Sequence, residues 1–272
     1  MKNIEEYFSL IKTYKLLANK SLGQNFLINP DCAESIANLL DVNDDDVVLE
    51  IGAGLGSLSY FLVKKGKVEL IDIDERMLNF LNDHYSSLDN VTIRRQNILK
   101  EDLSKFTKII GNLPYYITSG IIEHILLNGI NAKKIVLMCQ KEVYPKLLKN
   151  SPSPISLMLN YVSEISSPMN VNRNNFTPVP HVDSVVFSLT PNENIKNKDN
   201  KSLYKLISKL FLYRRKTILN CLTNIVSDKE VASNLLNELG VKADARAEQL
   251  DISFYNNLLK LLKLKGLDTK IV

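Results

Sequence analysis

The chain has 272 residues, is 45% hydrophobic and carries a formal net charge of +4 at pH 7. It can bury a substantial core and is long enough for one large domain, alone or with a small appendage. It has no run of about 18 or more apolar residues, and Glu5 and Glu6 lie where a signal peptide needs an apolar stretch, so we expect a cytoplasmic protein without a membrane span. Its cysteines, Cys32, Cys139 and Cys221, are odd in number and match no metal-binding spacing, which favours reduced thiols and no metal site.

The elements predicted in chain order alternate between helices and strands. A helix is expected up to residue 18, a loop over 20–27, and a helix over 32–40 that Asn29 or Asp31 caps. Strands follow at 47–51, 67–72, 91–94, near 109, at 134–138 and at 183–189, with helices at 57–65, 75–84 and near 122 between the earlier ones. Repeated strand–helix–strand units predict an α/β fold of Rossmann-like type, with a mostly parallel sheet and helices on both of its faces.

The composition changes over residues 191–201, which are polar and rich in Asn and Lys. We interpret this stretch as a linker, and the periodicity after it is helical to the end. The sequence therefore predicts two domains, residues 1–190 and an all-helical domain of residues 191–272. Between Lys196 and Lys216 the chain carries eight positive charges and only Asp199 as a negative one.

A glycine-rich turn follows the first predicted strand, in the pattern Glu50-x-Gly52-x-Gly54-x-Gly56. Such turns let the backbone approach a ligand, and Asp72 at the end of the next strand can accept hydrogen bonds from ribose hydroxyls. The pattern is typical of a nucleoside-bearing cofactor. Glu50 favours an adenosine-type methyl donor over a nicotinamide dinucleotide, and a tight turn without a ligand is the third interpretation.

A second loop, Asn112-Leu113-Pro114-Tyr115, follows the apolar run 108–110. Proline restricts its own φ and the residue before it, so the loop is stiff. It places an amide and a flat ring side by side at the edge of a sheet, which suits a planar base with an exocyclic amine. A plain turn with a packed tyrosine is the alternative.

Six stretches in the same order resemble the ribosomal RNA adenine dimethyltransferase family, on its small-subunit branch, over nearly the whole chain. They are residues 22–27 (LGQNFL), 50–56 (EIGAGLG), 112–115 (NLPY), 176–184 (FTPVPHVDS), 211–217 (FLYRRKT) and 246–250 (RAEQL). The resemblance implies a catalytic domain that binds S-adenosylmethionine over residues 1–190 and a helical RNA-binding domain over 191–272.

The resemblance also implies roles for individual residues. The cofactor-binding residues are expected to be Asn25, Leu27, Glu50, Gly52, Gly54, Asp72, Asn97 and Asn112. The target adenine is expected to meet Asn112, the carbonyl of Leu113, and the rings of Tyr115 and Phe176. Arg214, Arg215 and Lys216 are expected to bind RNA; Phe211, Arg214 and Arg215 are spaced as on one helical face, which suits phosphate contacts.

The chain departs from the usual family pattern at three places. Asn97 stands where the family usually has Asp, Asp72 where it often has Glu, and residues 153–157 (SPISL) replace a Tyr-Gly-Arg-like run. The last change removes one possible RNA contact. A carboxylate at position 97 would accept the amine of the cofactor's adenine, and we expect the amide to do so more weakly.

The implied activity is the S-adenosylmethionine-dependent N6,N6-dimethylation of two adjacent adenosines near the 3′ end of small-subunit (16S) ribosomal RNA. The expected partner is the immature small ribosomal subunit, bound by a monomer. Two alternatives stay open: a large-subunit ribosomal RNA adenine methyltransferase that confers macrolide resistance, and a non-catalytic ribosome-assembly factor that binds RNA. The intact 112–115 loop argues for catalysis.

Overall fold

The computed structural model describes residues 3–13, 19, 23–129, 131–193, 199–213 and 215–269. These residues form two compact units. One comprises residues 1–145 and 163–192, and the other comprises residues 146–162 and 193–272. The second unit thus takes in residues 146–162 in addition to the C-terminal helices, whereas the division at residue 190 remains a prediction about independent domains.

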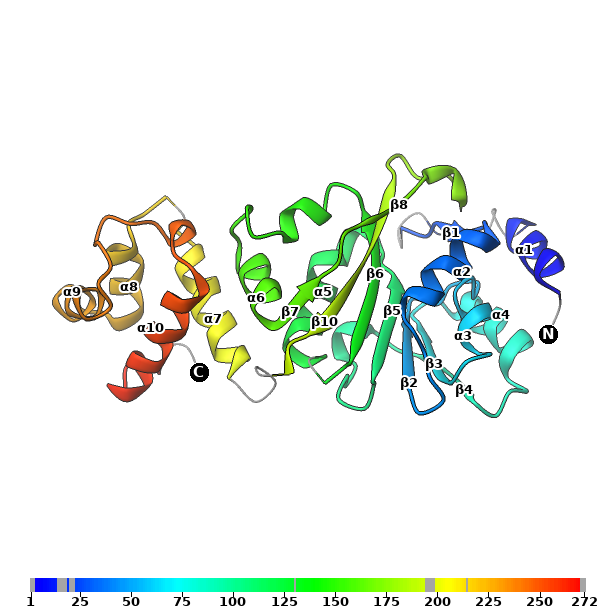
Figure 1. Ribbon diagram of the computed structural model, residues 1–272, viewed down its shortest axis with the longest axis horizontal. Coiled ribbons are helices and arrows are strands. Elements are labelled where there is room, and N and C mark those ends of the chain that lie inside the picture. Colours follow the sequence, from blue (N-terminus) through cyan, green and yellow to red (C-terminus); the bar gives the residue numbers. More distant parts are fainter. Residues whose placement is uncertain are drawn as a thin grey trace. The chain divides into compact units, whose positions relative to one another are not determined.

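A central sheet organises the first unit (Figure 1). Its strands run in the order β4-β3-β2-β5-β6-β10-β7, and β8 also pairs with β10. The strands are β2 (Val47–Ile51), β3 (Lys67–Asp72), β4 (Val91–Arg95), β5 (Lys108–Asn112), β6 (Lys134–Gln140), β7 (Ser163–Ile165), β8 (Met169–Val171) and β10 (Ser184–Pro191). β2 to β6 pair in parallel, and β10 is antiparallel to β6. The predicted mostly parallel sheet is confirmed.

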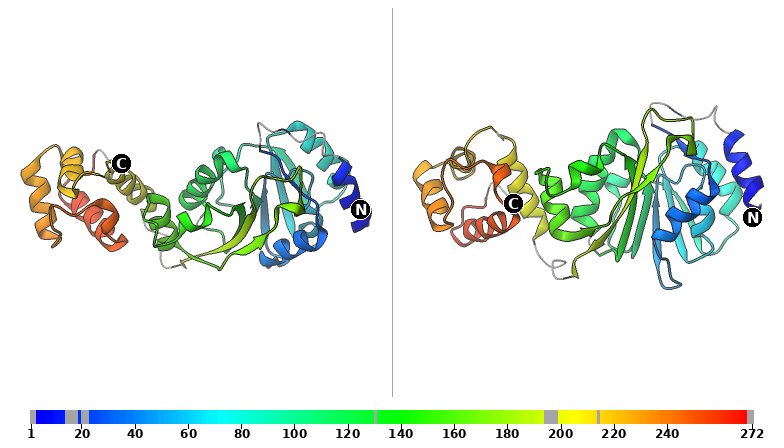
Figure 2. Two further views of the ribbon diagram at one scale, coloured as in Figure 1. Left: turned by 90° about the horizontal axis from the view of Figure 1, so that it is seen from above. Right: turned by 45° about the horizontal axis from the view of Figure 1, so that its top comes forward.

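Helices lie against both faces of this sheet (Figures 1 and 2). They are α2 (Pro30–Leu39), α3 (Ser59–Leu62), α4 (Glu75–Tyr85) and α5 (Thr118–Asn128), whereas α1 (Ile4–Thr13) packs against α2. Short 3-10 turns lie at η3 (Ile98–Lys100), η4 (Tyr115–Ile117), η5 (Tyr144–Leu147) and η6 (Arg173–Asn175). Asn29 caps α2 as predicted, because its side chain accepts the backbone N–H of Cys32. α3 is shorter than the predicted helix over 57–65, and the part of the first predicted helix over 14–18 lies outside the described residues.

A small two-stranded sheet joins segments far apart in the sequence. β1 (Phe26–Leu27) pairs antiparallel with β9 (Phe176–Thr177), so that Leu27 lies opposite Phe176. This pairing brings two of the sequence motifs together beside the ends of the central strands.

The second unit is helical. Its helices are α6 (Pro154–Val162), α7 (Asn200–Phe211), α8 (Ile218–Val226), α9 (Lys229–Glu238) and α10 (Ile252–Leu264), with a 3-10 turn at η8 (Ala247–Gln249). α7 packs against α6, α8 and α10. The predicted helical C-terminal region is confirmed. α7 ends at Phe211, so Arg215 does not continue its helical face as expected, and Arg214 lies outside the described residues. Thr217 then caps α8 by accepting the N–H of Asn220.

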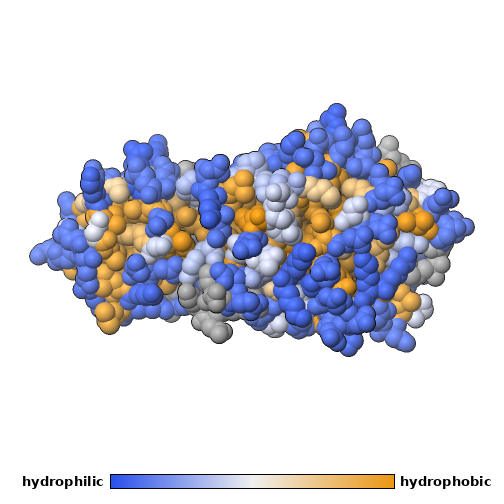
Figure 3. All heavy atoms as spheres, viewed as in Figure 1, coloured by the Kyte–Doolittle hydropathy of each residue, from blue (hydrophilic) through white to orange (hydrophobic). Residues whose placement is uncertain are grey.

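Polar and charged residues are spread over the face shown in Figure 3, with apolar residues between them. Among the residues that the structure describes, no helix combines the length and the apolar character that a membrane crossing requires.

Candidate active site

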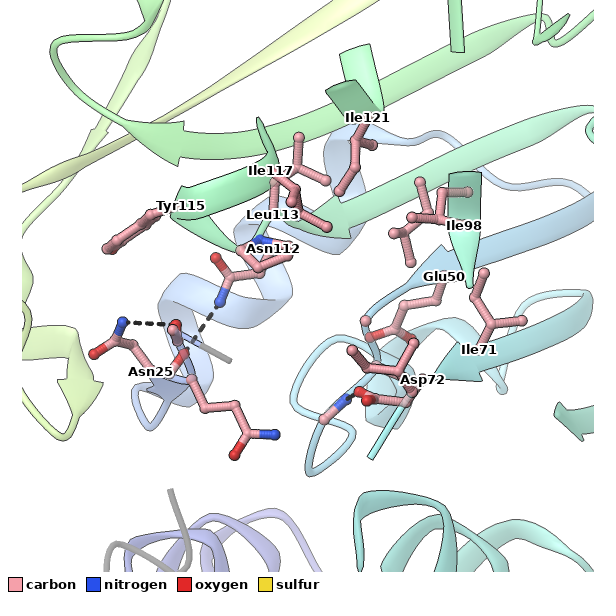
Figure 4. Close-up of a pocket in the computed structure, with 18 of the residues that line it drawn as sticks. Asn25, Glu50, Ile71, Asp72, Ile98, Asn112, Leu113, Tyr115, Ile117 and Ile121 are labelled. Carbon is pink, nitrogen blue, oxygen red and sulfur yellow. Dashed lines mark hydrogen bonds between the residues drawn. The ribbon is translucent and has the colours of Figure 1, made fainter. Parts of the chain in front are cut away.

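A cavity of the first unit lies where the parallel strands end (Figure 4). The chain runs from β2 to β3 and β4 on one side and continues with β5 and β6 on the other, so the strand order reverses between β2 and β5. Ligands of open α/β sheets bind at such a reversal, outside the carboxyl ends of the strands. The cavity measures about 270 Å³. Of the predicted site residues, those that line it are Asn25, Leu27, Glu50, Gly52, Gly54, Asp72, Asn97, Asn112, Leu113 and Tyr115.

The glycine-rich loop after β2 forms one wall of the cavity. Gly54 has a φ of +56°, which side-chain-bearing residues rarely adopt, and a Cβ there would lie 3.5 Å from the ring of Phe26. Its backbone N–H donates a 2.9 Å hydrogen bond to Oδ2 of Asp72 at the end of β3. The loop and the predicted ribose-binding carboxylate are therefore held together by the fold itself.

Glu50 is a buried carboxyl group at the end of β2. Glu50 is only 2% exposed, and its Oε2 accepts a 2.6 Å hydrogen bond from the hydroxyl of Ser59. Burial raises the pKa of Glu50 to about 8, and the nearby Asp72 adds to the rise, while the Ser59 hydrogen bonds oppose it. At neutral pH a carboxyl group with this pKa is mostly protonated.

Asp72 lies beside it on the neighbouring strand. Its two oxygens accept backbone N–H groups, Oδ2 from Gly54 and Oδ1 from Asp74 at 2.9 Å each. Burial raises the pKa of Asp72, although these backbone hydrogen bonds act in the opposite direction. Each carboxylate oxygen can accept further bonds, so the side chain retains the acceptors that a ribose diol needs.

Asn112 ends β5 and faces the cavity. Its Nδ2 donates a 3.2 Å hydrogen bond to the backbone carbonyl of Asn25. Because a carbonyl oxygen only accepts, this contact fixes which way the amide points, and Oδ1 is turned to the side of Tyr115 (Figure 4). The cavity thus presents an oriented acceptor beside a flat ring.

The segment 23–27 ties the parts of the site to one another. The carbonyl of Leu27 accepts a 2.7 Å bond from the Ser57 hydroxyl, which follows the glycine-rich loop. Gln24 donates to Oδ2 of Asp74 at 2.9 Å, and Nδ2 of Asn25 donates to the carbonyl of Gly23 at 3.1 Å. This segment therefore contacts the ends of β2, β3 and β5, which explains why its motif accompanies the other two.

The 112–115 loop is held on both sides. The N–H of Leu113 donates a 2.9 Å bond to the carbonyl of Met138 in β6, and the phenol of Tyr115 lies 3.2 Å from the Ser184 hydroxyl in β10. Burial raises the pKa of Tyr115, so the phenol stays neutral at physiological pH. The ring of Tyr115 can take part in stacking and hydrogen bonding but is not a base.

Asn97 follows β4 and lines the cavity as an exposed residue. Its Oδ1 accepts the N–H of Leu99 at 3.0 Å and so caps η3. The amide oxygen expected to face the cofactor therefore already accepts one bond, and the amide still offers the second lone pair of that oxygen and its Nδ2 group. The sequence suggested that the Asn97 amide oxygen simply replaces a carboxylate oxygen as acceptor for the adenine amine. The structure differs, because this oxygen also caps η3.

Phe176 does not lie where the sequence predicted. Its side chain is only 1% exposed, is part of the hydrophobic core and does not line the cavity. The physical reason is the β1–β9 pairing, which places Phe176 opposite the buried Leu27. In this structure Phe176 supports the wall behind the cavity, and its stacking on a base stays a prediction.

The predicted RNA-binding residues lie in the second unit. Arg215 and Lys216 are exposed in the turn between α7 and α8, and the ammonium group of Lys216 lies 4.7 Å from the ring centre of Tyr213. Arg214 lies outside the described residues. Their proposed role rests on charge and exposure.

Several residues with a place in the site were missed, among them Ile73, Leu99 and Ser59. Ile73 and Leu99 line the cavity although they are 41% and 40% exposed, and Ser59 holds Glu50. Ile73 directly follows Asp72 and Leu99 lies two residues after Asn97, so an apolar residue at the open end of a strand was the available signal. Nothing in the sequence singled out Ser59.

These groups suit a positively charged nucleoside. Two buried carboxyl groups, Glu50 and Asp72, lie on adjacent strands, and no cation is paired with either in the described residues. Buried carboxyl groups without a counterion favour a cationic ligand, and apolar Ile73 and Leu99 offer surfaces for an adenine ring. The cavity therefore fits the sulfonium-bearing adenosine that the motifs imply.

Comparisons with known proteins agree with this site. The family model described as ribosomal RNA adenine dimethylase matches residues 15–264. Ribosomal RNA small subunit methyltransferase A of Bacillus pumilus is 34% identical, with 93% of this chain and 94% of that protein covered, and the protein of the same name from Mycoplasma capricolum is 36% identical, with 92% and 99% covered. The crystal structure of a dimethyladenosine transferase from Plasmodium falciparum superposes with a TM-score of 0.75 at 27% identity, covering 88% of this chain and 97% of that one. The chain belongs to the ribosomal RNA adenine dimethylase family.

Proposed function

We propose that this protein transfers methyl groups from S-adenosylmethionine to N6 of two adjacent adenosines near the 3′ end of small-subunit ribosomal RNA. The observation that carries the proposal is the oriented Asn112 amide, whose Oδ1 faces the cavity beside Tyr115 while Nδ2 is bound to the carbonyl of Asn25. Family membership and the relatives named small subunit methyltransferase A support the same substrate.

The cavity would hold the cofactor through residues of three strands. Asp72 is the proposed acceptor for the ribose hydroxyls, and Gly52 and Gly54 let the backbone come close to the cofactor. Glu50 is the carboxyl group proposed to interact with the positive charge of the cofactor. When bound, S-adenosylmethionine supplies a methyl group on a positively charged sulfur. Asn25, Leu27 and Asn97 complete the proposed lining.

The target base needs help because the N6 lone pair of adenine is delocalised into the ring. Oδ1 of Asn112 and the carbonyl of Leu113 are the proposed acceptors for the two N6 hydrogens. They favour a pyramidal N6 with its lone pair aimed at the methyl carbon. Tyr115 stacks on the base once it has left its RNA stack. Just after N6 accepts the methyl group it is positively charged and strongly acidic, and it passes its proton to water, so no strong general base is required.

RNA binding would draw on the exposed cations of the second unit. Arg215 and Lys216 are the proposed phosphate contacts, and Arg214 is proposed with them from its place in the motif. We further propose that the protein acts in the cytoplasm as a monomer, on immature small ribosomal subunits. One chain supplies both the cavity and the basic turn, which supports action by a monomer.

The test is methyl transfer from labelled S-adenosylmethionine to immature small subunits and, separately, to large-subunit ribosomal RNA, with the modified nucleotide mapped. We expect N6,N6-dimethyladenosine at two adjacent positions of the small-subunit RNA only. Modification of the large-subunit RNA would instead support the macrolide-resistance activity. Binding to small subunits without methyl transfer would support the non-catalytic assembly factor.

A further inference from the structure

One polar contact links the 112–115 loop to a strand that is far away in the sequence. The phenol oxygen of Tyr115 lies 3.2 Å from Oγ of Ser184, across 69 positions of the chain. Ser184 is fully buried, whereas Tyr115 is half-buried and lines the cavity. A buried hydroxyl without a partner is costly, so this pair satisfies Ser184 and at the same time restrains the ring of Tyr115.

The topology of the sheet explains how the two side chains meet. Asn112 at the end of β5 is in register with Met138 of β6, and Gln140 of β6 is in register with Ser184 at the start of β10. Tyr115 leaves β5 through the short turn η4 and reaches across the end of β6 to β10. The backbone of Ser184 is fixed by pairing with β6 and β8, so it is a rigid anchor for a ring that is carried on a turn.

We propose that Ser184 is a positioning residue that holds the ring of Tyr115 in the orientation required to stack on the target adenine. This inference rests on the function proposed above, in which Tyr115 contacts the flipped base. It gives the 176–184 motif a physical role, because Phe176 of that motif is turned into the core while Ser184 reaches the site through the phenol. The ring of a tyrosine without this bond can rotate about its side-chain torsions, and part of its population then lies away from the base.

A double-mutant cycle isolates this contact. The variants are Ser184→Ala, Tyr115→Phe and the double variant, each of which keeps the cavity walls and the aromatic ring. Single-turnover methylation of small subunits is measured, together with the affinity for S-adenosylmethionine. We expect each single variant to be slower by about fivefold, as for the loss of one neutral hydrogen bond, and the double variant to be no slower than either. Cofactor affinity stays unchanged.

A second measurement follows the base directly. A target RNA with 2-aminopurine at the methylation position loses fluorescence when a ring stacks on it, and this base has no N6 to be methylated. We expect weaker quenching in Ser184→Ala and in Tyr115→Phe than in the wild type, by the same amount. Ser188→Ala, on the same face of β10, is the matched control and should match the wild type in both measurements.

The outcomes separate this inference from the proposed function. If the wild-type protein does not methylate small subunits, the proposed function fails. If it does, but the two single effects multiply in the double variant or the quenching is the same in all variants, Ser184 does not position Tyr115. Melting temperatures of all variants show whether a loss of rate comes from loss of folding.

Discussion

At the scale of single residues, the chemistry of the site depends on which atoms are already bound. Nδ2 of Asn112 is used within the protein, and this leaves its oxygen for a substrate amine. Oδ1 of Asn97 already accepts one bond as the cap of η3. Asn112 therefore offers a free oxygen, whereas Asn97 offers its Nδ2 group and the second lone pair of a bonded oxygen.

Replacement of Asn112 by Ala should abolish most of the methyl transfer. It removes the oriented acceptor for N6, and loss of one such partner in a transition state costs about a hundredfold or more in rate. The measurement is the single-turnover rate with saturating small subunits. Near-normal turnover would contradict the role assigned to Asn112.

Asn112→Asp is the informative companion variant. A carboxylate keeps an acceptor but cannot donate to the carbonyl of Asn25, so the side chain loses the bond that orients it. We expect a rate well below the wild type despite the retained acceptor. Unchanged melting temperatures of both variants would show that the fold is intact.

Glu50 makes cofactor binding depend on pH. Its pKa is raised to about 8 by burial and by the nearby Asp72, and a cationic ligand favours the ionised form. Below about pH 8, binding of the cation must therefore release a proton from Glu50. Affinity should rise with pH from about 6 to about 8, by at most about tenfold per pH unit, and level off above that range. Calorimetric titration over this range measures it.

Two controls test the assignment to Glu50. In Glu50→Gln the carboxyl proton is absent, so the steep dependence should be lost. S-adenosylhomocysteine lacks the sulfonium charge, so its binding to the wild type should vary less with pH. A wild-type affinity that is flat over the range, or a dependence that persists in Glu50→Gln, would assign the proton to another group.

The Glu50 pKa also has a consequence for stability without ligand. Because the folded-state pKa lies above the unfolded one, the protonated group favours the folded state. This contribution is fully present below the unfolded pKa of about 4.3 and is lost as pH rises toward about 8. Cofactor affinity and unliganded stability should therefore change in opposite directions with pH.

Asn97→Asp should tighten the binding of S-adenosylmethionine. A carboxylate has two equivalent oxygens, so one can continue to cap the N–H of Leu99 while the other accepts the adenine amine. The gain from a charge-assisted bond is about 1 kcal/mol, which corresponds to a few-fold up to about tenfold in affinity. Calorimetry at equal salt compares the two proteins, with Asn97→Ala as the variant that loses both contacts. Equal or weaker binding by Asn97→Asp would mean that the pocket is adapted to the amide.

At the scale of elements, the sequence predicted those strands and helix caps that depend only on residues close together in the chain. The strands over 47–51 and 67–72 and the Asn29 cap follow from β-branched runs and from a capping side chain. β7 and β8 were not predicted, because three-residue strands exist only through pairing with β10. The site residues were found where a motif marks the end of a strand, and Phe176 was misplaced because a two-residue pairing decides which way it faces.

The end of α7 shows the same limit. No glycine or proline interrupts residues 211–217, so the helical pattern gave no reason to stop at Phe211. The start of α8 could have been predicted, because Thr217 is a good capping residue, and its side chain accepts the N–H of Asn220. A capping residue within a continuous helical pattern was thus the missed sign of a turn.

The first helix also contributes to the cofactor loop. The phenol of Tyr7 in α1 donates a 2.8 Å bond to the carbonyl of Leu55 and accepts a 2.7 Å bond from Tyr85 of α4. A Cβ on Gly56, whose φ is +71°, would lie 2.6 Å from the Tyr7 oxygen. The two helices therefore hold the glycine-rich loop from behind, through buried hydroxyl groups.

Tyr7→Phe should loosen this loop. We expect a loss of about 1 to 2 kcal/mol in the free energy of unfolding, because the Tyr85 hydroxyl loses its shorter hydrogen bond and the Leu55 carbonyl loses the phenol donor. We also expect a few-fold weaker binding of S-adenosylmethionine. Chemical denaturation and calorimetry measure the two effects. Tyr161→Phe, whose phenol bonds to Asn256 in the second unit, is the control that should leave cofactor affinity unchanged. Equal cofactor affinity in Tyr7→Phe would show that α1 is not part of the binding apparatus.

At the scale of the whole molecule, the mild net charge conceals an uneven distribution. Residues 196–216 carry a net charge of +7, so the remainder of the chain carries −3. The acidic groups of the cavity lie in one compact unit, and the basic turn between α7 and α8 lies in the other. Such a division suits a protein that attracts a polyanion with one unit and a cationic cofactor with the other.

Removal of the two described cations of this turn tests that division. In the double variant Arg215→Ala with Lys216→Ala, RNA affinity should fall, and the slope of log affinity against log salt should become less steep by about 1.4 to 1.8, the value for two phosphate contacts. Affinity for S-adenosylmethionine should not change, because neither residue lines the cavity. The matched control is Lys229→Ala with Lys242→Ala, which removes the same charge from exposed positions of the second unit. If both double variants shift the slope equally, only net charge matters; an unaltered slope in the first would mean that its cations are merely solvated.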